Sequence, residues 1–123
     1  MLLVEDEPTL ARVLGIVLKT AGYLVVPCAD GAEALEWFRA APDEIHVVVS
    51  DVSIPGLTGD RLAHALHEIR PALPVILMTG FSYAVTPENA GALGVAAVLQ
   101  KPIGIDELIM TVDAVFKRAR KEA

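Results

Sequence analysis

The sequence predicts an α/β protein, a three-layer sandwich with five parallel strands in the middle and helices on both faces. Short apolar runs without polar alternation recur along the chain, which is typical of strands buried on both faces of a parallel sheet. These runs alternate with segments of helical periodicity, as crossover connections between parallel strands require. The chain has 123 residues, the size of one ordinary domain, so residues 1–123 are expected to form a single domain.

The first two strand–helix pairs are predicted at residues 1–4, 8–21, 23–26 and 32–40. Pro8 suits the first turn of a helix, and apolar side chains then recur every three or four residues until a glycine ends the pattern. Pro27 is expected to end the second strand, because proline lacks the backbone donor that a strand needs. The second helix is expected to turn Leu35 and Phe38 toward the core.

The central segment is predicted to form a strand at residues 47–49, a helix at 59–69 and a strand at 75–78. The first of these strands consists of three valines and ends where Ser50 and Asp51 begin. The helix is expected to bury one face, formed by Leu62, Leu66 and Ile69.

The last segment is predicted to form a loop at 81–86, a helix from 87, a strand at 95–99 and a helix at 105–118. Gly91 and Gly94 weaken the first of these helices, so it should be short. The final helix has acids in its first turn and bases at its end, which complements the helix dipole without any binding partner.

Composition excludes several classes of protein. The longest apolar run, residues 90–99, has ten residues, whereas a helix needs about 20 to cross a bilayer, so no membrane insertion is expected. Neither a basic region nor a cleavage site precedes the first strand, so no secretory signal is expected. Cys28 is the only cysteine, which excludes an internal disulfide or a cysteine-based metal cage. The formal net charge of -6 disfavours direct nucleic-acid binding, and a cytoplasmic protein is predicted.

Polar side chains follow four of the five predicted strands, namely Glu5, Asp6, Asp51, Thr79 and Lys101. Because the carboxyl ends of parallel strands open onto one edge, we expect these side chains to converge. Three carboxylates in one cleft repel, so the cleft should either hold a proton with a raised pKa or bind a cation. Ligands that are all oxygen favour Mg²⁺.

Asp51 is the candidate nucleophile. Lys101 supplies a positive charge, and the Thr79 hydroxyl can donate to a phosphoryl oxygen. A carboxylate beside a metal, a lysine and a hydroxyl suits acceptance of a phosphoryl group, because that transfer depends mainly on positioning and charge neutralisation. The alternative for Asp51 alone is a turn residue that caps backbone amides, and the converging side chains disfavour it.

Four segments together resemble the receiver domains of two-component response regulators. They are Leu-Val-Glu-Asp-Glu-Pro at 3–8, Ser-Asp-Val-Ser-Ile-Pro-Gly-Leu-Thr-Gly at 50–59, Met-Thr-Gly at 78–80 and Lys-Pro at 101–102. All four occur in order at the ends of the predicted strands, over nearly the whole chain. The resemblance implies a flavodoxin-like fold with strand order 2-1-3-4-5. The runs at 78–82 and 93–95 are more similar to receivers of hybrid histidine kinases than to those of DNA-binding regulators, so a parent protein of that kind is expected.

The resemblance also implies a role for each site residue. Asp51 would accept a phosphoryl group from a histidine kinase or a histidine phosphotransfer protein, Lys101 would pair with the phosphate, and Thr79 would sense it. The implied Mg²⁺ ligands are Glu5, Asp6, Asp51 and the backbone carbonyl of Ser53. Such a phosphoprotein is not a free-standing enzyme, although it promotes its own phosphorylation and dephosphorylation. The resemblance further permits a cis bond between Lys101 and Pro102, and a homodimer through the fourth helix, fifth strand and fifth helix.

Two positions depart from the family pattern. Ile54 stands where the family usually has methionine, and its similar volume should be tolerated. Val98 stands where many receivers carry a tyrosine or phenylalanine that turns inward when the threonine moves. Valine cannot act as that switch, so phosphorylation should be relayed by shifts of the backbone or the fourth helix, or only weakly. This departure keeps a second function open, that of a pseudo-receiver binding partners without phosphorylation.

Two further functions are known on similar sheets. A phosphatase with an aspartyl nucleophile typically has a second acid two residues later, where this chain has Ser53, and a substrate-cap segment, which this chain lacks. A flavin-binding protein would need a phosphate loop after the first strand, where Glu5 and Asp6 would repel phosphate.

Five other side chains have chemistry that these functions do not use. His46, His64 and His67 are expected on solvated surfaces, because no carboxylate or cysteine accompanies them at metal-binding spacing. Cys28 is expected to fill space in the core, and Trp37 to lie at the core margin, with a partner surface as its alternative.

Overall fold

The computed structural model describes residues 1–80 and 85–122. Its centre is a five-stranded sheet in the order β2-β1-β3-β4-β5, with every neighbouring pair parallel. The strands are β1 (Leu2–Val4), β2 (Val26–Cys28), β3 (Val48–Asp51), β4 (Val75–Thr79) and β5 (Ala97–Gln100). This order confirms the predicted flavodoxin-like fold, and it makes β1 and β3 neighbours.

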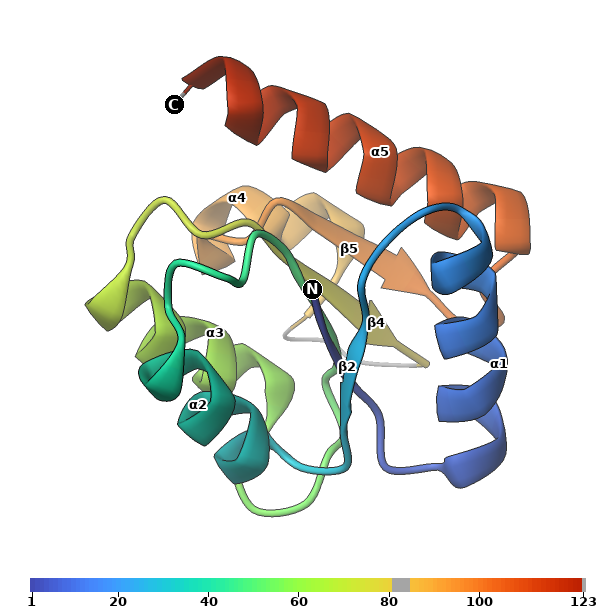
Figure 1. The fold of residues 1–123 in the computed structure, drawn as a ribbon, viewed down its shortest axis with the longest axis horizontal. Helices are drawn as coiled ribbons and strands as arrows, with labels where there is room; N and C mark the ends of the chain where they lie inside the picture. Colours follow the sequence, from blue (N-terminus) through green and yellow to red (C-terminus); the bar gives the residue numbers. More distant parts are fainter. Residues whose placement is uncertain (81–84, 123) are drawn as a thin grey trace.

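Helices cover both faces of the sheet (Figure 1). They are α1 (Pro8–Thr20), α2 (Gly31–Ala40), α3 (Gly59–Ile69), the short 3-10 helix η1 (Pro87–Asn89), α4 (Ala90–Leu93) and α5 (Ile105–Glu122). Figure 1 shows α1 and α5 on one side of the sheet and α2 and α3 on the other. The three layers are therefore those predicted.

An apolar layer lies on each face of the sheet. The layer against α1 and α5 includes Leu3, Leu18, Val49, Ile76 and Leu108. The layer against α2 and α3 includes Phe38, Val48, Leu62, Leu66 and Leu77. Burial of these side chains is the main force that holds the helices on the sheet. It also explains why the strands lack the polar alternation of half-exposed strands.

Two helices begin with side-chain caps close to the predicted starts. The Glu7 carboxylate accepts hydrogen bonds from the N–H groups of Thr9 (3.1 Å) and Leu10 (2.7 Å) at the start of α1. The Asp30 carboxylate accepts one from Glu33 N–H (2.8 Å) at the start of α2. Such caps satisfy backbone donors that the first turn of a helix leaves without partners.

The second strand differs from the prediction. β2 begins at Val26 rather than at residue 23, and it contains Pro27, which we expected to end it. Proline is tolerated there because β2 is an edge strand that pairs with β1 alone. Tyr23 lies before the strand, where its hydroxyl donates a hydrogen bond to the Asp113 carboxylate of α5.

The inward face of α3 also differs in one position. Leu62 and Leu66 are buried as predicted, but Ile69 is 43% exposed and Ala63 is buried instead. After Leu66 the buried stripe continues with a step of four residues to the half-buried Arg70 rather than with a step of three to Ile69, so Ile69 lies on the exposed side.

The fourth helix is short, as predicted. η1 and α4 together span only Pro87 to Leu93, and α4 ends at Gly94, whose φ of 73° suits glycine. The predicted loop at 81–86 falls largely on residues 81–84, which lie outside the described residues. β5 begins two residues later than predicted, and α5 continues past residue 118 to Glu122.

The histidines occupy three different settings. His64 is exposed, and its Nε2 lies 3.2 Å from Glu68 Oε1, which confirms a solvated position. His67 is half-buried instead, with Nε2 2.8 Å from the Leu73 carbonyl oxygen, so it holds the loop before β4. His46 is exposed, as predicted, and its ring meets Phe116 edge to face.

Cys28 and Trp37 are the remaining side chains with a predicted setting. Cys28 is buried, and burial, followed by the charges of Glu33 and Asp30, raises the pKa of its thiol to about 12, so it is an inert core residue. Trp37 is 46% exposed on α2, and its place at the core margin stays a prediction. No helix in the part of the chain that the structure describes has the length and apolarity of a membrane span.

Candidate functional site

The register of the sheet brings the polar strand ends together. Val4 pairs with Ser50 across β1 and β3, so the next residues, Glu5 just after β1 and Asp51 at the last position of β3, lie side by side. Asp51 in turn pairs with Met78 of β4. Because the strands are parallel, all these groups lie at the same edge of the sheet.

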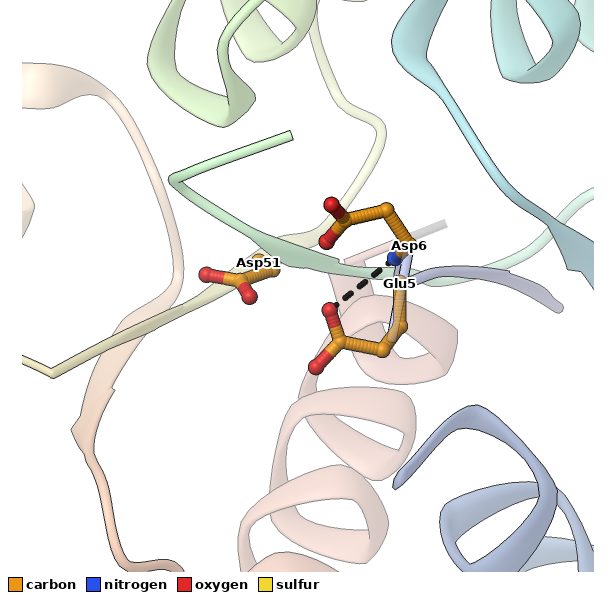
Figure 2. A group of neighbouring side chains, drawn as sticks. All are labelled: Glu5, Asp6 and Asp51. Atoms are coloured by element: carbon orange, nitrogen blue, oxygen red, sulfur yellow. Dashed lines mark hydrogen bonds between the residues drawn. The ribbon is translucent and has the colours of Figure 1, made fainter. Parts of the chain in front are cut away.

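Three carboxylates form a compact acidic cluster at this edge (Figure 2). Glu5, Asp6 and Asp51 each offer an oxygen, and these oxygens all lie within 4.8 Å of one another. Glu5 is 3% exposed and Asp51 6% exposed, whereas Asp6 is exposed to solvent. The cluster therefore has a buried base and an open side.

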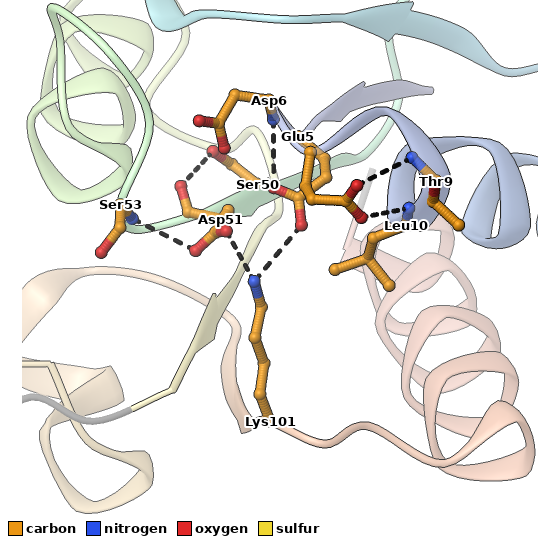
Figure 3. Close-up of polar contacts among 9 residues, drawn as sticks. Glu5, Asp6, Thr9, Leu10, Ser50, Asp51, Ser53 and Lys101 are labelled. Carbon is orange, nitrogen blue, oxygen red and sulfur yellow. Dashed lines mark hydrogen bonds and ion pairs between the residues drawn. The ribbon is translucent and has the colours of Figure 1, made fainter.

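Lys101 is the cation of the site (Figure 3). It follows β5, and its Nζ lies 2.6 Å from Asp51 Oδ2 and 3.2 Å from Glu5 Oε1. The Lys101–Pro102 peptide bond is cis, as the resemblance permitted. One ammonium faces three carboxylates, so the site keeps an excess of negative charge that a divalent cation can neutralise.

Hydrogen bonds hold Asp51 on both its side chain and its backbone (Figure 3). The Ser53 N–H donates to Asp51 Oδ1 (3.1 Å), while Oδ2 accepts from Lys101. The buried Ser50 hydroxyl donates to the Asp51 carbonyl (2.9 Å). Both oxygens of the carboxylate therefore have a partner, which fixes its orientation.

Gly59 packs directly against the backbone of Asp51. A Cβ built on Gly59 would lie 2.4 Å from the Asp51 carbonyl oxygen and 2.9 Å from Val52 Cα, closer than real contacts allow. The Gly59 N–H also donates to the Val52 carbonyl (2.9 Å). The sequence reasoning treated Gly59 only as the start of a helix. The position of Gly59 at the end of the 50–59 segment could have indicated its importance. Its contact with the Asp51 backbone is a tertiary one, however, and the sequence does not show it.

Electrostatics follow from burial and crowding. Burial, and then the hydrogen bond and charge of Asp51, raise the pKa of Glu5 to about 7, although Lys101 opposes the shift. Burial alone would lower the pKa of Lys101, but the hydrogen bonds and charges of Asp51 and Glu5 outweigh it, so the net shift is upward. Lys101 therefore stays charged, while Glu5 holds its proton at higher pH than an isolated glutamate does.

The acidic cluster fits a magnesium ion. Its donors are all carboxylate oxygens that lie within 4.8 Å of one another, and one of the three residues is open to solvent. Mg²⁺ prefers oxygen ligands and retains some of its water, which the exposed side of the cluster permits. Such acidic clusters are typical of the Mg²⁺ sites of receivers.

Thr79 lies beside Lys101 at the end of β4. It is buried, it pairs with Gln100 of β5, and its carbonyl oxygen accepts a hydrogen bond from the Lys101 N–H (2.8 Å). Ser53, the predicted source of a carbonyl ligand, follows Asp51 by two residues and already contacts its carboxylate. The structure thus places Thr79 beside Lys101 and Ser53 beside Asp51 at this end of the sheet.

The two residues that depart from the family pattern are both buried. Ile54 lies just beyond β3, and Val98 lies on β5 opposite Leu77. Both belong to the apolar layer on the α2–α3 face. Val98 therefore occupies a core position with no aromatic ring to rotate.

The sequence matches the family model described as the response regulator receiver domain over residues 1–113. It is 34% identical over 120 residues to the probable transcriptional regulatory protein TcrX of Mycobacterium tuberculosis, covering 96% of this chain and 50% of that protein. It is 33% identical over 119 residues to the sensor kinase CckA of Brucella abortus, covering 96% of this chain and 12% of that protein. The chain spans half or less of the length of these relatives. Both transcription regulators and sensor kinases thus carry similar segments, and the expected greater similarity to receivers of hybrid kinases stays a prediction.

The fold also matches solved structures. A response regulator receiver domain protein from Clostridium thermocellum superposes with a TM-score of 0.92 at 24% identity, covering 99% of this chain and 97% of that one. At this identity the likeness concerns the fold alone, and it confirms the arrangement of strands and helices described above.

Proposed function

The chain belongs to the family of response regulator receiver domains, and from this membership we propose that Asp51 accepts a phosphoryl group in a two-component phosphorelay. One observation carries the proposal. The Asp51 carboxylate is buried and oriented against Lys101, within a cluster of two further carboxylates. A structural aspartate would not need a second and third acid beside it, since their repulsion costs stability.

The proposed reaction transfers a phosphoryl group from a phosphohistidine to Asp51. A carboxylate oxygen of Asp51 forms a bond to phosphorus while the bond between phosphorus and the histidine nitrogen breaks, and its electron pair returns to the ring. Lys101 Nζ, now paired with Asp51 Oδ2, stays in place to neutralise the phosphoryl oxygens. The Thr79 hydroxyl donates to one of these oxygens and so senses the modification.

Glu5, Asp6, Asp51 and the Ser53 carbonyl are the proposed ligands of Mg²⁺. When bound, the ion supplies positive charge that neutralises the transferring group. The residues of this chain already contribute orientation, because Ser53 and Ser50 hold Asp51 on both sides. This preorganisation lowers the cost of reaching the reactive geometry.

A histidine kinase or a histidine phosphotransfer protein is the proposed donor, and phosphorylation then changes binding to partners. We propose that residues 1–123 act as one receiver domain, that the domain works in the cytoplasm, and that a hybrid kinase is one parent it suits. A homodimer through α4, β5 and α5 is a further proposal.

A pseudo-receiver is the second candidate function, and Val98 favours it. The residue is buried in the core and cannot make the aromatic rotation that many receivers use. Under this alternative the domain binds its partner equally well with and without phosphorylation, although the acidic cluster is intact.

Intact-mass measurement after incubation with a small phosphodonor and Mg²⁺ tests the proposal. The wild type should gain one phosphoryl group that mild base removes, as an acyl phosphate requires. Asp51→Asn should gain none, whereas the exposed Asp43→Asn should behave as the wild type. A wild type without the base-labile gain, or an Asp51→Asn variant with an undiminished gain, would overturn the phosphoacceptor role.

A further inference from the structure

A basic cavity lies at the amino-terminal end of the strands, whereas Asp51 lies at their carboxyl-terminal end. His46 precedes β3, Arg70 lies between α3 and β4, and Phe116, Ala119 and Arg120 lie on the last turns of α5; together they line a cavity of about 250 Å³. These positions are at the amino ends of the strands, whereas the acidic cluster is at their carboxyl ends. The cavity is therefore separate from the phosphorylation site.

Arg70 is held in place at one side of this cavity. Its Nη1 donates to the carbonyl oxygens of Pro42 (2.9 Å) and Ile45 (2.6 Å), while the side chain remains half-buried. These two bonds use one of the guanidinium nitrogens and leave other donors of the planar group for a ligand. An arginine fixed in this way loses little further conformational freedom when it binds an anion.

Phe116 forms an aromatic wall of the cavity. The His46 ring meets it edge to face at 6.4 Å, and Tyr23 meets it at 6.1 Å. The Arg120 guanidinium lies 5.9 Å from the centre of the ring. Asp113, one turn earlier on α5, accepts the hydrogen bond of the Tyr23 hydroxyl.

A second cavity adjoins the first across Ala119, which lines both. It measures about 310 Å³, and its residues, among them Leu73, Pro74 and Val115, present somewhat more polar than apolar surface to it. Arg118 is its only charged lining residue. We call the two adjoining cavities the basic surface.

The arginines of the basic surface lack acidic partners. The chain has 16 acids against 10 lysines and arginines, yet in residues 1–80 and 85–120 the ion pairs are formed by His64 and Lys101. Arg70, Arg118 and Arg120 have none there. Most other lysines and arginines in this part of the chain also have no acidic partner, so the relevant feature is that three guanidiniums gather around two adjoining cavities, where an external anion can contact more than one of them.

We propose that the basic surface binds an acidic, partly apolar segment of a partner protein. A carboxylate of the segment pairs with Arg70 and Arg120, and a neighbouring apolar side chain packs against Phe116 in the same cavity, whose lining is largely apolar. Cavities that enclose a whole small molecule usually measure roughly 300–1,000 Å³, so the basic cavity is sized for a side chain. Arginine and aromatic residues are also the types that dominate protein interfaces.

The overall charge argues against nucleic acid as the occupant. Binding of a phosphate backbone relies on many cations spread over a surface, whereas this domain is acidic overall. The proposal goes beyond phosphoacceptance, because the two sites lie at opposite edges of the sheet. An experiment can therefore contradict partner binding at the basic surface without contradicting phosphorylation of Asp51, and the reverse.

Nuclear magnetic resonance titration of the isotopically labelled domain tests this proposal. The probes are a synthetic peptide of alternating glutamate and leucine and a matched peptide with glutamine in place of glutamate. We expect the glutamate peptide to shift the amide signals of Arg70 and Phe116 and the glutamine peptide to bind about tenfold more weakly. Arg120→Gln should weaken binding of the glutamate peptide about tenfold, whereas the exposed Arg61→Gln on α3 should change it less than about twofold.

Three results would overturn the proposal. They are an absence of shifts with the glutamate peptide, equal binding of the glutamine peptide, and an Arg120→Gln effect no larger than that of Arg61→Gln. A DNA oligonucleotide that shifts the same signals more strongly would assign the surface to nucleic acid instead. Because Arg70 also supports the loop before β3, the exposed Arg120 carries the test. Phosphorylation of Asp51, measured by intact mass, should be unchanged in Arg120→Gln.

Discussion

The end of β3 and the segment from η1 to β5 differ in how closely they are packed. At the end of β3 the carboxylate of Asp51 accepts from Ser53 and Lys101, and Gly59 leaves no room for a Cβ. In α4 a Cβ on Gly91 would meet no atom within 4 Å. The end of β3 is therefore closely packed and held by hydrogen bonds. The segment from η1 to β5 begins with two short helices that have no buried residues.

This difference separates the chemistry of the domain from its readout. A phosphoacceptor benefits from groups that are oriented before the reaction, which the partners of Asp51 provide. A switch element benefits from low local stability, which short helices with few buried contacts provide. Val98 lies in the core beneath the second region and supplies no rotating ring. We therefore expect phosphorylation to be relayed by shifts of the backbone or of α4, or only weakly.

Glycine-to-alanine substitution at the two regions should give opposite results. Gly59→Ala should lower the free energy of unfolding by about 2–4 kcal/mol, because its methyl group collides with the Asp51 carbonyl. Gly91→Ala should raise it by up to about 1 kcal/mol, because alanine favours helix and meets open space. Urea denaturation of both variants measures the two changes. Equal losses at the two positions would show that the regions are packed alike.

The strand ends were predictable because they depend on local and topological rules. Buried strands are visible as valine-rich and leucine-rich runs, and parallel pairing sends their polar ends to one edge, so Glu5, Asp51 and Lys101 could be gathered from the sequence. Features that depend on position within the assembled sheet were not predictable in this way. Pro27 is tolerated because β2 is an edge strand, and the pattern of the chain does not show which strand is at an edge.

Contacts between distant segments were also missed. Gly59 is required because α3 begins directly against the backbone of β3. The sequence spacing between Asp51 and Gly59 does not show how closely their backbones approach. His67 was expected in solvent, but the loop that returns from α3 to β4 places the Leu73 carbonyl beside it. Arg70 likewise meets the loop before β3, which lies more than 20 residues earlier in the chain. Tertiary packing decides all three.

The raised pKa of Glu5 should make stability depend on pH in the absence of metal. The pKa is about 7 in the folded chain against 4.5 normally, so between these values the folded state binds more protons than the unfolded one. The free energy of unfolding should therefore fall by roughly 2–3 kcal/mol from this group as pH rises from about 4.5 to 7, and the small remaining contribution of Glu5 should be lost within about one further pH unit.

Urea denaturation at several pH values in the presence of a chelator measures this dependence. Glu5→Gln, which cannot ionise, should remove this component and leave the rest of the pH profile in place. The exposed Glu36→Gln is the matched control and should leave the component intact. A stability that rises between pH 5 and 7 in the wild type but not in Glu5→Gln would reverse the assigned direction of the shift.

Magnesium affinity should show the opposite pH dependence at the same residue. Mg²⁺ requires an ionised Glu5, so a proton competes with the ion below pH 7, and the affinity should fall by up to about tenfold per pH unit there. Calorimetric titration between pH 6 and 8 measures this effect. Asp6→Asn should weaken binding at every pH while keeping the slope, and Glu5→Gln should flatten it. An unchanged slope in Glu5→Gln would assign the competing proton to another group.

Thr79→Ala should have the smallest effect on partner binding. It tests whether the segment from η1 to β5 responds to phosphorylation without an aromatic switch. Without an aromatic side chain at position 98, loss of the Thr79 hydroxyl should change phosphorylation-dependent affinity for a histidine phosphotransfer partner by less than about threefold. In a Val98→Tyr background the same substitution should have a larger effect, because the added ring can then respond to it. The double-mutant cycle on affinity measures the coupling, with Asp51 phosphorylation checked in each variant. Complete loss of phosphorylation-dependent binding in Thr79→Ala alone would show that the relay runs through the hydroxyl despite Val98, and the separation of chemistry from readout would then fail.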